Sequence, residues 1–287
     1  MKKIVIFGST GLLGKPVTRA LIDAGFDVTV LVRNETLALK LFPKATIIKG
    51  DLKNESDIEK AIEGQEAIFL SLSVTQTEKE HGFHTEQEGL DTVIKVAKAR
   101  NVKRITYLSS LVHLYQGMDG FDWWIFRIKK EAVRKIKESG IPYTIFYPST
   151  FMESIAYQSR QGNMIAIGGK SEYPLYYIAA EDYARQVVGS FKILKDENRD
   201  YVVQGPDAFT QAEAAKVFIK HYKKEKLHTM WAPMFLMKIM GIFARKFDYG
   251  YHIVTALNKY PEKFEAAQTW EELGKPTITL KAFAERI

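Results

Sequence analysis

Short apolar runs alternate with amphipathic segments through the first half of the chain. The apolar runs predict strands at 4–7, 27–32, 45–49, 67–72 and 104–109, and the segments of helical spacing predict helices near 15–24, 55–63 and 83–100. A longer helix is expected from about Trp123 to Ser139, ended by Gly140, and a sixth strand over 143–147, stopped by Pro148. This alternation is typical of an α/β fold with a doubly wound parallel sheet.

The alternation fades after residue 150. Residues 151–180 are mixed, a helix is expected near 181–195, and a short strand at 201–204 returns to the sheet; the rest is largely helical. We therefore expect a core over 1–150 and a smaller, mainly helical C-terminal substrate or lid region over 151–287. Aromatic and methionine side chains of this region are candidates either for an apolar substrate pocket or for ordinary core: Phe151, Met152, Tyr157, Tyr173, Tyr176, Tyr177, Trp231, Met234, Met237 and Met240.

A glycine-rich turn, GSTGLLG at 8–14, lies directly between the first apolar run and the first predicted helix. In this arrangement unpaired N–H groups and the helix dipole favour a pyrophosphate. Gly8 is expected to allow the turn, Gly11 to let the backbone approach the phosphates, and Gly14 to let the helix pack close to the strand. A second strand completes a βαβ unit, and the P-loop pattern G-x-x-x-x-G-K-[ST] is absent. The sequence thus predicts a dinucleotide site formed by Gly8, Ser9, Thr10, Gly11, Leu12, Leu13 and Gly14.

Residues that follow the next strands are candidates for the rest of that site. Arg33 follows the second strand, where an acidic residue would bind the ribose 2′-OH of NAD; an Arg suits a 2′-phosphate, so NADP(H) is favoured over NAD(H). Asp51 is placed to accept from an adenine amino group with Leu52 covering the ring, or simply to begin a turn. Ser71 and Leu72 end the fourth strand, at the edge where ligands of open sheets bind.

Composition narrows the function classes. The 41 basic and 34 acidic residues give a net charge of +7, but the bases are dispersed, and those between Arg127 and Lys137 are interleaved with acids, which predicts a solvated helix face rather than a nucleic-acid surface. The chain has no cysteine, which excludes disulfides and thiolate chemistry and fits a cytoplasmic protein. The most apolar segment, Trp231 to Phe247, is too short to span a bilayer, and we expect a core or lid helix there and no membrane partner.

Six motifs together carry a family resemblance: GSTGLLG at 8–14, VLVRN at 30–34, KGDL at 49–52, YLSS at 107–110, KESGIPYTIFYPSTFMES at 137–154 and IAAEDYA at 178–184. Over nearly its whole length the chain resembles the atypical short-chain dehydrogenase/reductases of the NmrA-like, NAD(P)H-binding group. The resemblance implies an NADP(H)-binding Rossmann core with a smaller C-terminal substrate region. It also implies either a reductase of the quinone, isoflavone or lignan type, or a redox sensor without turnover.

The catalytic residues depart from the superfamily pattern. Ordinary members carry a Tyr four residues before a Lys, but Ile125 precedes Lys129 and Phe126 precedes Lys130 at that spacing. The resemblance places the functional lysine at Lys129, with Lys130 as the alternative register.

The resemblance assigns roles to residues at the ends of two strands as well. It implies that a hydroxyl at Ser109 or Ser110 binds the substrate carbonyl, with Ser110 as the catalytic candidate, and that Ser109, Lys129 and Pro148 contact the cofactor. Tyr115 is a candidate to replace the missing Tyr. Tyr147 stands where relatives often carry Arg, which weakens the case for an anionic substrate contact there.

The histidine pair His81 and His84 has the spacing of a metal-binding H-x-x-H, but no third ligand stands at a recognised spacing, so surface histidines and no metal are expected. The leading hypothesis is therefore an NADPH-dependent oxidoreductase of a small apolar carbonyl or quinone, acting as a monomer or homodimer. The alternative is a non-catalytic sensor of the NADPH/NADP⁺ ratio, and the missing Tyr argues against a third option, a sugar-nucleotide epimerase.

Overall fold

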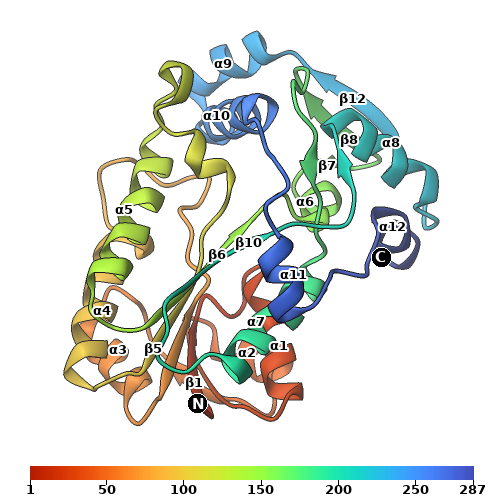
Figure 1. Cartoon of the computed structure of the whole chain (residues 1–287). Coiled ribbons are helices and arrows are strands. Elements are labelled where there is room, and N and C mark those ends of the chain that lie inside the picture. Colours follow the sequence, from red (N-terminus) through yellow and green to blue (C-terminus); the bar gives the residue numbers. More distant parts are fainter.

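A seven-stranded parallel sheet organises the computed structural model, which describes residues 1–287 (Figure 1). Its strand order is β10-β6-β5-β4-β1-β2-β3, and every neighbouring pair is parallel. The strands are β1 (Lys3–Phe7), β2 (Asp27–Val32), β3 (Thr46–Lys49), β4 (Ala67–Leu70), β5 (Arg104–Leu108), β6 (Tyr143–Pro148) and β10 (Arg199–Val203). The predicted doubly wound α/β fold is confirmed.

Helices cover both faces of this sheet. Helices α1 (Gly14–Asp23), α2 (Glu35–Leu41) and α7 (Ala180–Ile193) lie on one face, and α3 (Glu55–Ile62), α4 (Leu90–Ala99) and α5 (Trp124–Glu138) lie on the other (Figure 1). Each face of the sheet has its own hydrophobic core. In β1, Ile4 and Ile6 belong to the core under α1, α2 and α7, whereas Val5 and Phe7 belong to the core under α3, α4 and α5. A parallel strand that is buried on both faces has no polar side, which is why this run is apolar without interruption.

Two local features differ from the sequence prediction. The helix expected at 83–100 begins as a π-helical turn, η1 (Thr85–Gly89), before α4. Helix α2 was not expected, because only Ala38 of its seven residues is buried and its leucines Leu37 and Leu39 are exposed. A helix that buries one alanine leaves no apolar periodicity to detect.

The second half adds two small sheets and five helices beyond α7. Strands β7 (Arg160–Gln161), β8 (Met164–Gly168) and β12 (His228–Ala232) form one sheet, and β9 (Leu175–Tyr176) pairs with β11 (Ala208–Phe209). Helix α6 (Met152–Tyr157) precedes α7. The five helices beyond α7 are α8 (Gln211–His221), α9 (Met234–Phe243), α10 (Arg245–Lys259), α11 (Ala267–Leu273) and α12 (Leu280–Arg286). Residues 199–203 return to the large sheet beside β6, and the division at residue 150 stays a prediction.

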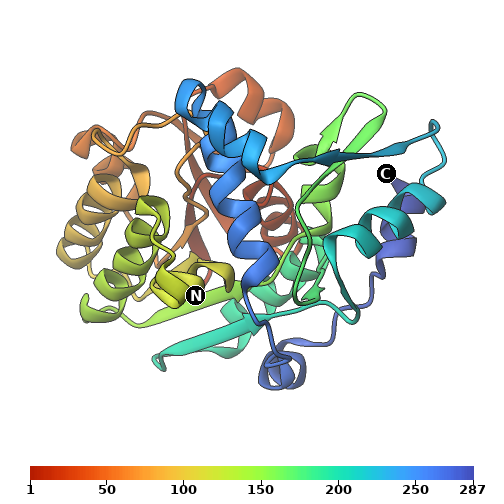
Figure 2. The same cartoon turned by 90° about the horizontal axis from the view of Figure 1, so that it is seen from above.

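Helices α9 and α10 lie above the carboxyl edge of the large sheet (Figures 1 and 2). The two helices follow one another in sequence and pack against each other. Helix α10 also contacts the short 3₁₀ turn η2 (Val112–Tyr115) that follows β5. The pair therefore roofs the edge at which ligands of parallel sheets bind. None of the helices has the length and apolar character needed to cross a bilayer.

A fully buried arginine ties three segments at the other end of the sheet. Arg104, the first residue of β5, donates through one guanidinium nitrogen to the Tyr143 carbonyl at 3.0 Å and the Thr144 hydroxyl at 2.9 Å. Its other terminal nitrogen donates to the carbonyls of Lys195 and Glu197, which precede β10. One side chain thus links β5 to β6 and to the loop that delivers β10.

We expect Arg104→Met to lower the free energy of unfolding by roughly 3 kcal/mol, because it removes four hydrogen bonds and leaves their acceptors unpaired. Urea denaturation followed by circular dichroism measures this change. The matched control is Lys103→Met: Lys103 is exposed and pairs with Glu66 at the surface, so its loss should cost less than about 1 kcal/mol. Equal losses in the two variants would contradict the role given to Arg104.

Candidate active site

The predicted site residues come together because the parallel strands end at one edge of the sheet. The chain runs from β1 outward to β3 and then crosses to β4 on the other side of β1, so β1 and β4 flank the switch point where ligands of such sheets bind. Along this edge, in the order β3, β2, β1, β4 and β5, the strands are followed by Asp51, Arg33, Gly8, Ser71 and Ser109. Strand β6 comes next and ends at Pro148. Strand β4 ends at Leu70, so Ser71 and Leu72 lie just beyond it.

The glycine turn is closed on its protein side. Gly8 has a φ of +84°, and a Cβ there would stand 2.1 Å from the Ser71 carbonyl oxygen across the switch point. A Cβ at Gly14 would stand 2.1 Å from the Gly8 carbonyl oxygen. Both positions therefore require glycine for backbone packing alone.

Gly11 is different because its missing side chain faces open space. It is exposed, and a Cβ there would meet only the Gly8 oxygen, at 3.3 Å. Helix α1 begins three residues later with no side-chain cap and no acid in its first turn. The buried Ser9 hydroxyl has no hydrogen-bond partner. An open cradle, an uncapped helix start and an orphaned hydroxyl are what a bound pyrophosphate requires, so the turn fits a dinucleotide.

The residues expected near the adenosine lie on the same edge. Arg33 is exposed and makes no ion pair, while Asn34 beside it caps α2 by accepting from the Leu37 N–H. Asp51 accepts from the Lys53 N–H and so begins a turn, the second of the two roles considered for it. Its own N–H donates to Asp57, and this bond is the main reason that the pKa of Asp57 lies below its ordinary value. The half-buried Leu52 packs near Gly89 at the start of α4.

Lys129 projects from α5 into a buried polar cluster. Its Nζ donates to Glu86 Oε1 at 2.5 Å, and the Tyr107 hydroxyl donates to the same oxygen at 2.5 Å. The Lys129 side chain is 12% exposed and that of Glu86 is fully buried. Glu86 comes from η1 and Tyr107 from β5, so three elements meet at one ammonium group. Lys130, in contrast, is exposed and makes no ion pair.

Tyr107 was not anticipated as a neighbour of Lys129, and it is no substitute for a catalytic Tyr. Its hydroxyl lies 3.4 Å from the Lys129 Nζ, but burial and then the Glu86 carboxylate hold its pKa well above the ordinary value. A proton-transferring Tyr needs the opposite shift. Tyr115, the other candidate, is buried in η2 and donates to Asp119. Neither tyrosine is therefore poised to give up its proton.

His113 is a further buried group beside the two serines. Its Nδ1 lies within hydrogen-bond distance of the Ser110 carbonyl, and its ring stacks on Tyr147 with centroids 6.0 Å apart. Burial, followed by the positive charges of Lys129 and Lys130, lowers the pKa of His113 to about 4. A neutral imidazole therefore packs under Ser109 and Ser110. Burial also raises the pKa of Tyr147 to about 12.

A buried carboxyl group ties the segment after α10 to the sheet edge. Glu262 accepts from the Ser149 hydroxyl at 2.8 Å, just beyond β6, and from the Gln204 amide at 2.6 Å, just beyond β10. Burial outweighs these hydrogen bonds and raises the pKa of Glu262 to about 7. Glu262, Ser149 and Gln204 carry no recognisable sequence signal, because the chain that joins them is more than 50 residues long at each step.

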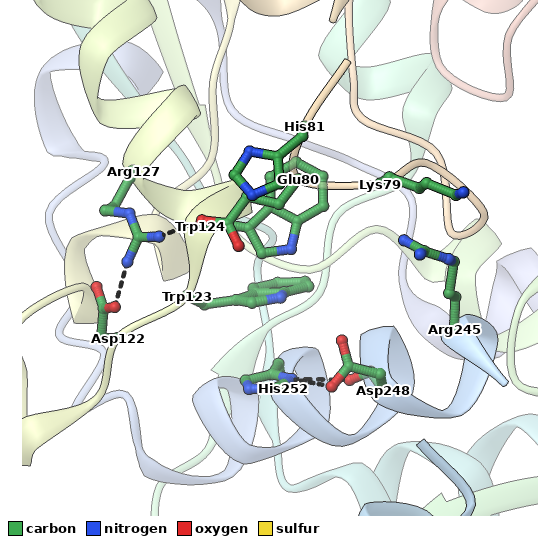
Figure 3. A pocket seen from close by; sticks show the side chains of 10 residues that line it. All are labelled: Lys79, Glu80, His81, Asp122, Trp123, Trp124, Arg127, Arg245, Asp248 and His252. Carbon is green, nitrogen blue, oxygen red and sulfur yellow. Dashed lines mark hydrogen bonds and ion pairs between the residues drawn. The ribbon is translucent and has the colours of Figure 1, made fainter. Parts of the chain in front are cut away.

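A cavity of about 500 Å³ opens beside the start of α5 (Figure 3). Three segments line it: 79–81 after β4, 122–127 at the start of α5, and the outer turns of α10 from 245 to 252. Arg127 bridges Glu80 and Asp122, whereas Lys79 and Arg245 make no ion pair. Trp123 stacks on His252 with centroids 5.5 Å apart, and Trp124 lies across the cavity. The cavity combines flat aromatic faces with two unpaired cations.

None of the aromatic and methionine candidates of the C-terminal region lines this cavity. Phe151, Met152 and Tyr177 are buried core, whereas Tyr157, Tyr173 and Trp231 are exposed. These six side chains are therefore either part of the hydrophobic core or exposed to solvent. Among the residues that line the cavity, only Trp123 and Trp124 are hydrophobic.

The two histidines of the H-x-x-H do not act together. His84 is buried, with Nδ1 2.8 Å from Glu78 and Nε2 3.1 Å from the Glu80 carbonyl, so both of its nitrogens are occupied. The carboxylates outweigh burial and raise its pKa. His81 is exposed at the cavity.

Comparisons with known proteins agree with this geometry. Residues 8–192 match the family model described as NAD(P)H-binding. The photosystem II assembly factor Ycf39 of Trieres chinensis is 24% identical over 256 residues, covering 87% of this chain and 78% of that protein. The (4-alkanoyl-5-oxo-2,5-dihydrofuran-3-yl)methyl phosphate reductase of Streptomyces griseus is 28% identical over 214 residues, covering 73% and 70%.

Solved structures share the whole fold. A nucleoside-diphosphate-sugar epimerase of Staphylococcus aureus superposes with a TM-score of 0.80 at 18% identity and covers 100% of both chains. An NADPH-dependent quinone oxidoreductase of Escherichia coli gives a TM-score of 0.72 at 20% identity and covers 98% of both. At these identities the likeness establishes the architecture.

We expect Gly11→Val to fold normally and to lose NADPH binding, because its side chain would fill the space that faces the phosphates while touching little protein. Thermal shift with and without NADPH measures this, and circular dichroism checks the fold. Gly14→Val is the contrast: its side chain collides with the turn itself, so this variant should be destabilised even without ligand. A ligand-induced rise in melting temperature that survives in Gly11→Val would show that the turn holds no phosphate.

Proposed function

Since the chain belongs to the NAD(P)H-binding family, we propose that it is an NADPH-dependent oxidoreductase that acts on a small carbonyl compound or quinone. The observation that carries this proposal is the Lys129 ammonium, held by a buried carboxylate at the edge of the sheet where the glycine turn opens. A solvated helical lysine would need no such partner. When bound, the cofactor supplies a hydride to the substrate.

The residues of this chain would orient that cofactor along the sheet edge. The turn at 8–14 takes the pyrophosphate, Arg33 pairs with the 2′-phosphate of NADPH, and Asp51 and Leu52 border the adenine. Ser71, Leu72, Ser109 and Pro148 follow the central strands and complete the path toward Lys129. The exposed and unpaired state of Arg33 supports its role, because its guanidinium is free for a charge-assisted contact.

Lys129 would bind the cofactor ribose and stabilise negative charge on the substrate oxygen; it would not replace the missing Tyr as proton donor. An ammonium group has three donors; Glu86 engages one at short distance, and the Tyr107 hydroxyl accepts from a second at 3.4 Å. The third donor would serve a ribose hydroxyl or a substrate oxygen on which negative charge develops. Ser110, which is only partly buried, would donate to the same oxygen, and the proton would come from Lys129 or from solvent.

The cavity beside α5 suggests a flat substrate. The half-buried Trp124 offers an aromatic surface, whereas Trp123 is buried and stacked on His252. Lys79 and Arg245 favour a substrate that carries or develops negative charge. Its lining includes Arg127 of α5, whereas Lys129, two residues later, lies nearly opposite on that helix. A quinone, which is planar and becomes anionic on reduction, matches both features.

A second function is favoured by one specific observation. No tyrosine near Lys129 has a lowered pKa, so the site has no prepared proton donor of the usual kind. A non-catalytic NADPH sensor would need the cofactor cradle but no such donor. It would bind NADPH and show no substrate-dependent oxidation with any quinone, aldehyde or enone.

We expect the protein to bind NADPH more tightly than NADH, and Arg33→Ala to narrow the difference by about one to two decades, corresponding to a lost phosphate contact of roughly 1.5–3 kcal/mol. Calorimetric titration of both nucleotides measures this. Lys40→Ala, an exposed cation on α2, is the matched control and should change neither affinity. Equal affinities for the two nucleotides in the parent protein would refute the preference.

We expect Lys129→Met to lower NADPH oxidation with a quinone panel by about 10²-fold and to weaken NADPH binding less, because the ammonium acts on charge that develops during the reaction. Stopped-flow absorbance at the nicotinamide band measures this rate. Lys130→Met, on the solvent side of the same helix, is the control and should retain activity.

Removal of Lys129 alone also leaves Glu86 as a buried unpaired charge, which destabilises the fold by itself. The double variant Glu86→Gln/Lys129→Met removes both charges and separates loss of folding from loss of chemistry. If the double variant is folded and fully active, the lysine assignment fails. If activity is lost in Lys130→Met instead, the functional register is one residue later.

A further inference from the structure

Helix α9 presents its large apolar side chains to solvent. The exposed fractions are 69% for Phe235, 51% for Ile239, 79% for Ile242 and 85% for Phe243, and no residue of the helix is buried. At 100° per residue these four positions fall on one side of the helix. Trp231, in the strand that leads into α9, is 59% exposed as well. The outward side of an ordinary surface helix is polar, and that of α9 is apolar.

The opposite side of α9 is fixed by close packing. Gly241 lies against the Asp248 backbone, where a Cβ would stand 3.0 Å from Asp248 Cα, and Met237 fills the space above Gly250. Met234 covers Gly168 and Gly169 at the end of β8. The helix is therefore seated through methionines and glycines, and its phenylalanines and isoleucines cannot turn inward without unseating it. The exposed apolar face is a fixed feature of the fold.

The segment that carries this face is basic. From Lys226 to Phe247 the chain contains no acidic residue, and its four cations, Lys226, Lys238, Arg245 and Lys246, are exposed and form no ion pair. A second copy of this surface would bring like charges together. An anionic surface would neutralise them.

We infer that α9 docks the protein onto an anionic membrane surface, with Trp231 and the apolar face of α9 in the interfacial layer and Lys238 and Lys246 beside the lipid phosphates. With 10 residues the helix is about 15 Å long, half the thickness of a hydrocarbon core, so it lies in the interface and does not cross it. The sequence predicts no membrane partner, because the segment Trp231 to Phe247 is too short to span a bilayer; docking in the interface needs no span.

Docking in this way would place the cavity near the lipid. Helix α10, against which α9 packs, contributes Arg245, Asp248 and His252 to the cavity lining (Figures 2 and 3). A lipid-dissolved quinone would then reach the cavity from the interface. This consequence rests on the proposed function, whereas the docking itself does not.

Vesicle sedimentation tests the docking directly. The full chain is mixed with vesicles of phosphatidylcholine alone or with 30% phosphatidylglycerol. We expect at least tenfold stronger binding to the anionic vesicles and a loss of binding as salt is raised. The variant Phe235→Gln/Ile239→Gln/Phe243→Gln should lose at least tenfold in binding, and Lys238→Gln/Lys246→Gln should lose the preference for anionic lipid. The control Leu37→Gln/Leu39→Gln changes two exposed leucines of α2 and should bind vesicles like the parent.

Two further measurements separate the outcomes. NADPH binding by the triple variant should equal that of the parent, so a defect in vesicle binding cannot be confused with a failed cofactor site or a misfolded chain. Sedimentation velocity reports the oligomeric state. Vesicle binding that is absent, or equal on neutral and anionic lipid, overturns the inference. A parent that forms a dimer, which the triple variant abolishes, would show that a second copy covers this face and would overturn it as well.

Discussion

The close approach of three backbone segments at the switch point is the constraint on which the rest of this structure depends. The Gly8 Cα lies against the Ser71 carbonyl, and the Gly14 Cα lies against the Gly8 carbonyl, with no room for a Cβ at either place. This contact fixes where β1 stops, where α1 starts and how near β4 comes. Because the turn is so tightly closed on the protein side, its only free face is at Gly11, and the start of α1 points its uncapped N–H groups there.

The second organising interaction is electrostatic. Tyr107 belongs to strand β5, and Glu86 and Lys129 come from η1 and α5 beside it; each would be an unfavourable buried group alone. Together they satisfy most of their hydrogen-bonding capacity, although Glu86 Oε2 has no partner. A lysine held in this way has a defined position before any ligand arrives, which is the form of preorganisation that charge stabilisation requires.

The region after residue 150 both borders the candidate site and carries an exposed apolar surface. Strand β10 and helix α7 complete the sheet, the Glu262 network fastens the chain after α10 to the ends of β6 and β10, and α10 lines the cavity. Helix α9 then lies outermost. Met234, Met237 and Gly241 make its inward contacts, which leaves its phenylalanines and isoleucines exposed beside the helix that lines the cavity.

The sequence by itself determined the sheet, because a strand buried on both faces is apolar throughout and the crossover helices that bury a whole face show a 3.6-residue period, as α2 does not. It also determined the glycine turn, since the spacing of Gly8, Gly11 and Gly14 reports backbone geometry directly. It could not give the partner of Lys129, because Glu86 lies 43 residues away and an isolated Glu in a helical segment carries no signal. The pairing of β12 with β8, the Glu262 network and the outward face of α9 were likewise decided by tertiary packing. The sequence of an apolar helix is the same whether the helix is buried or exposed, and only the packing of neighbouring elements decides which of its sides is exposed to solvent.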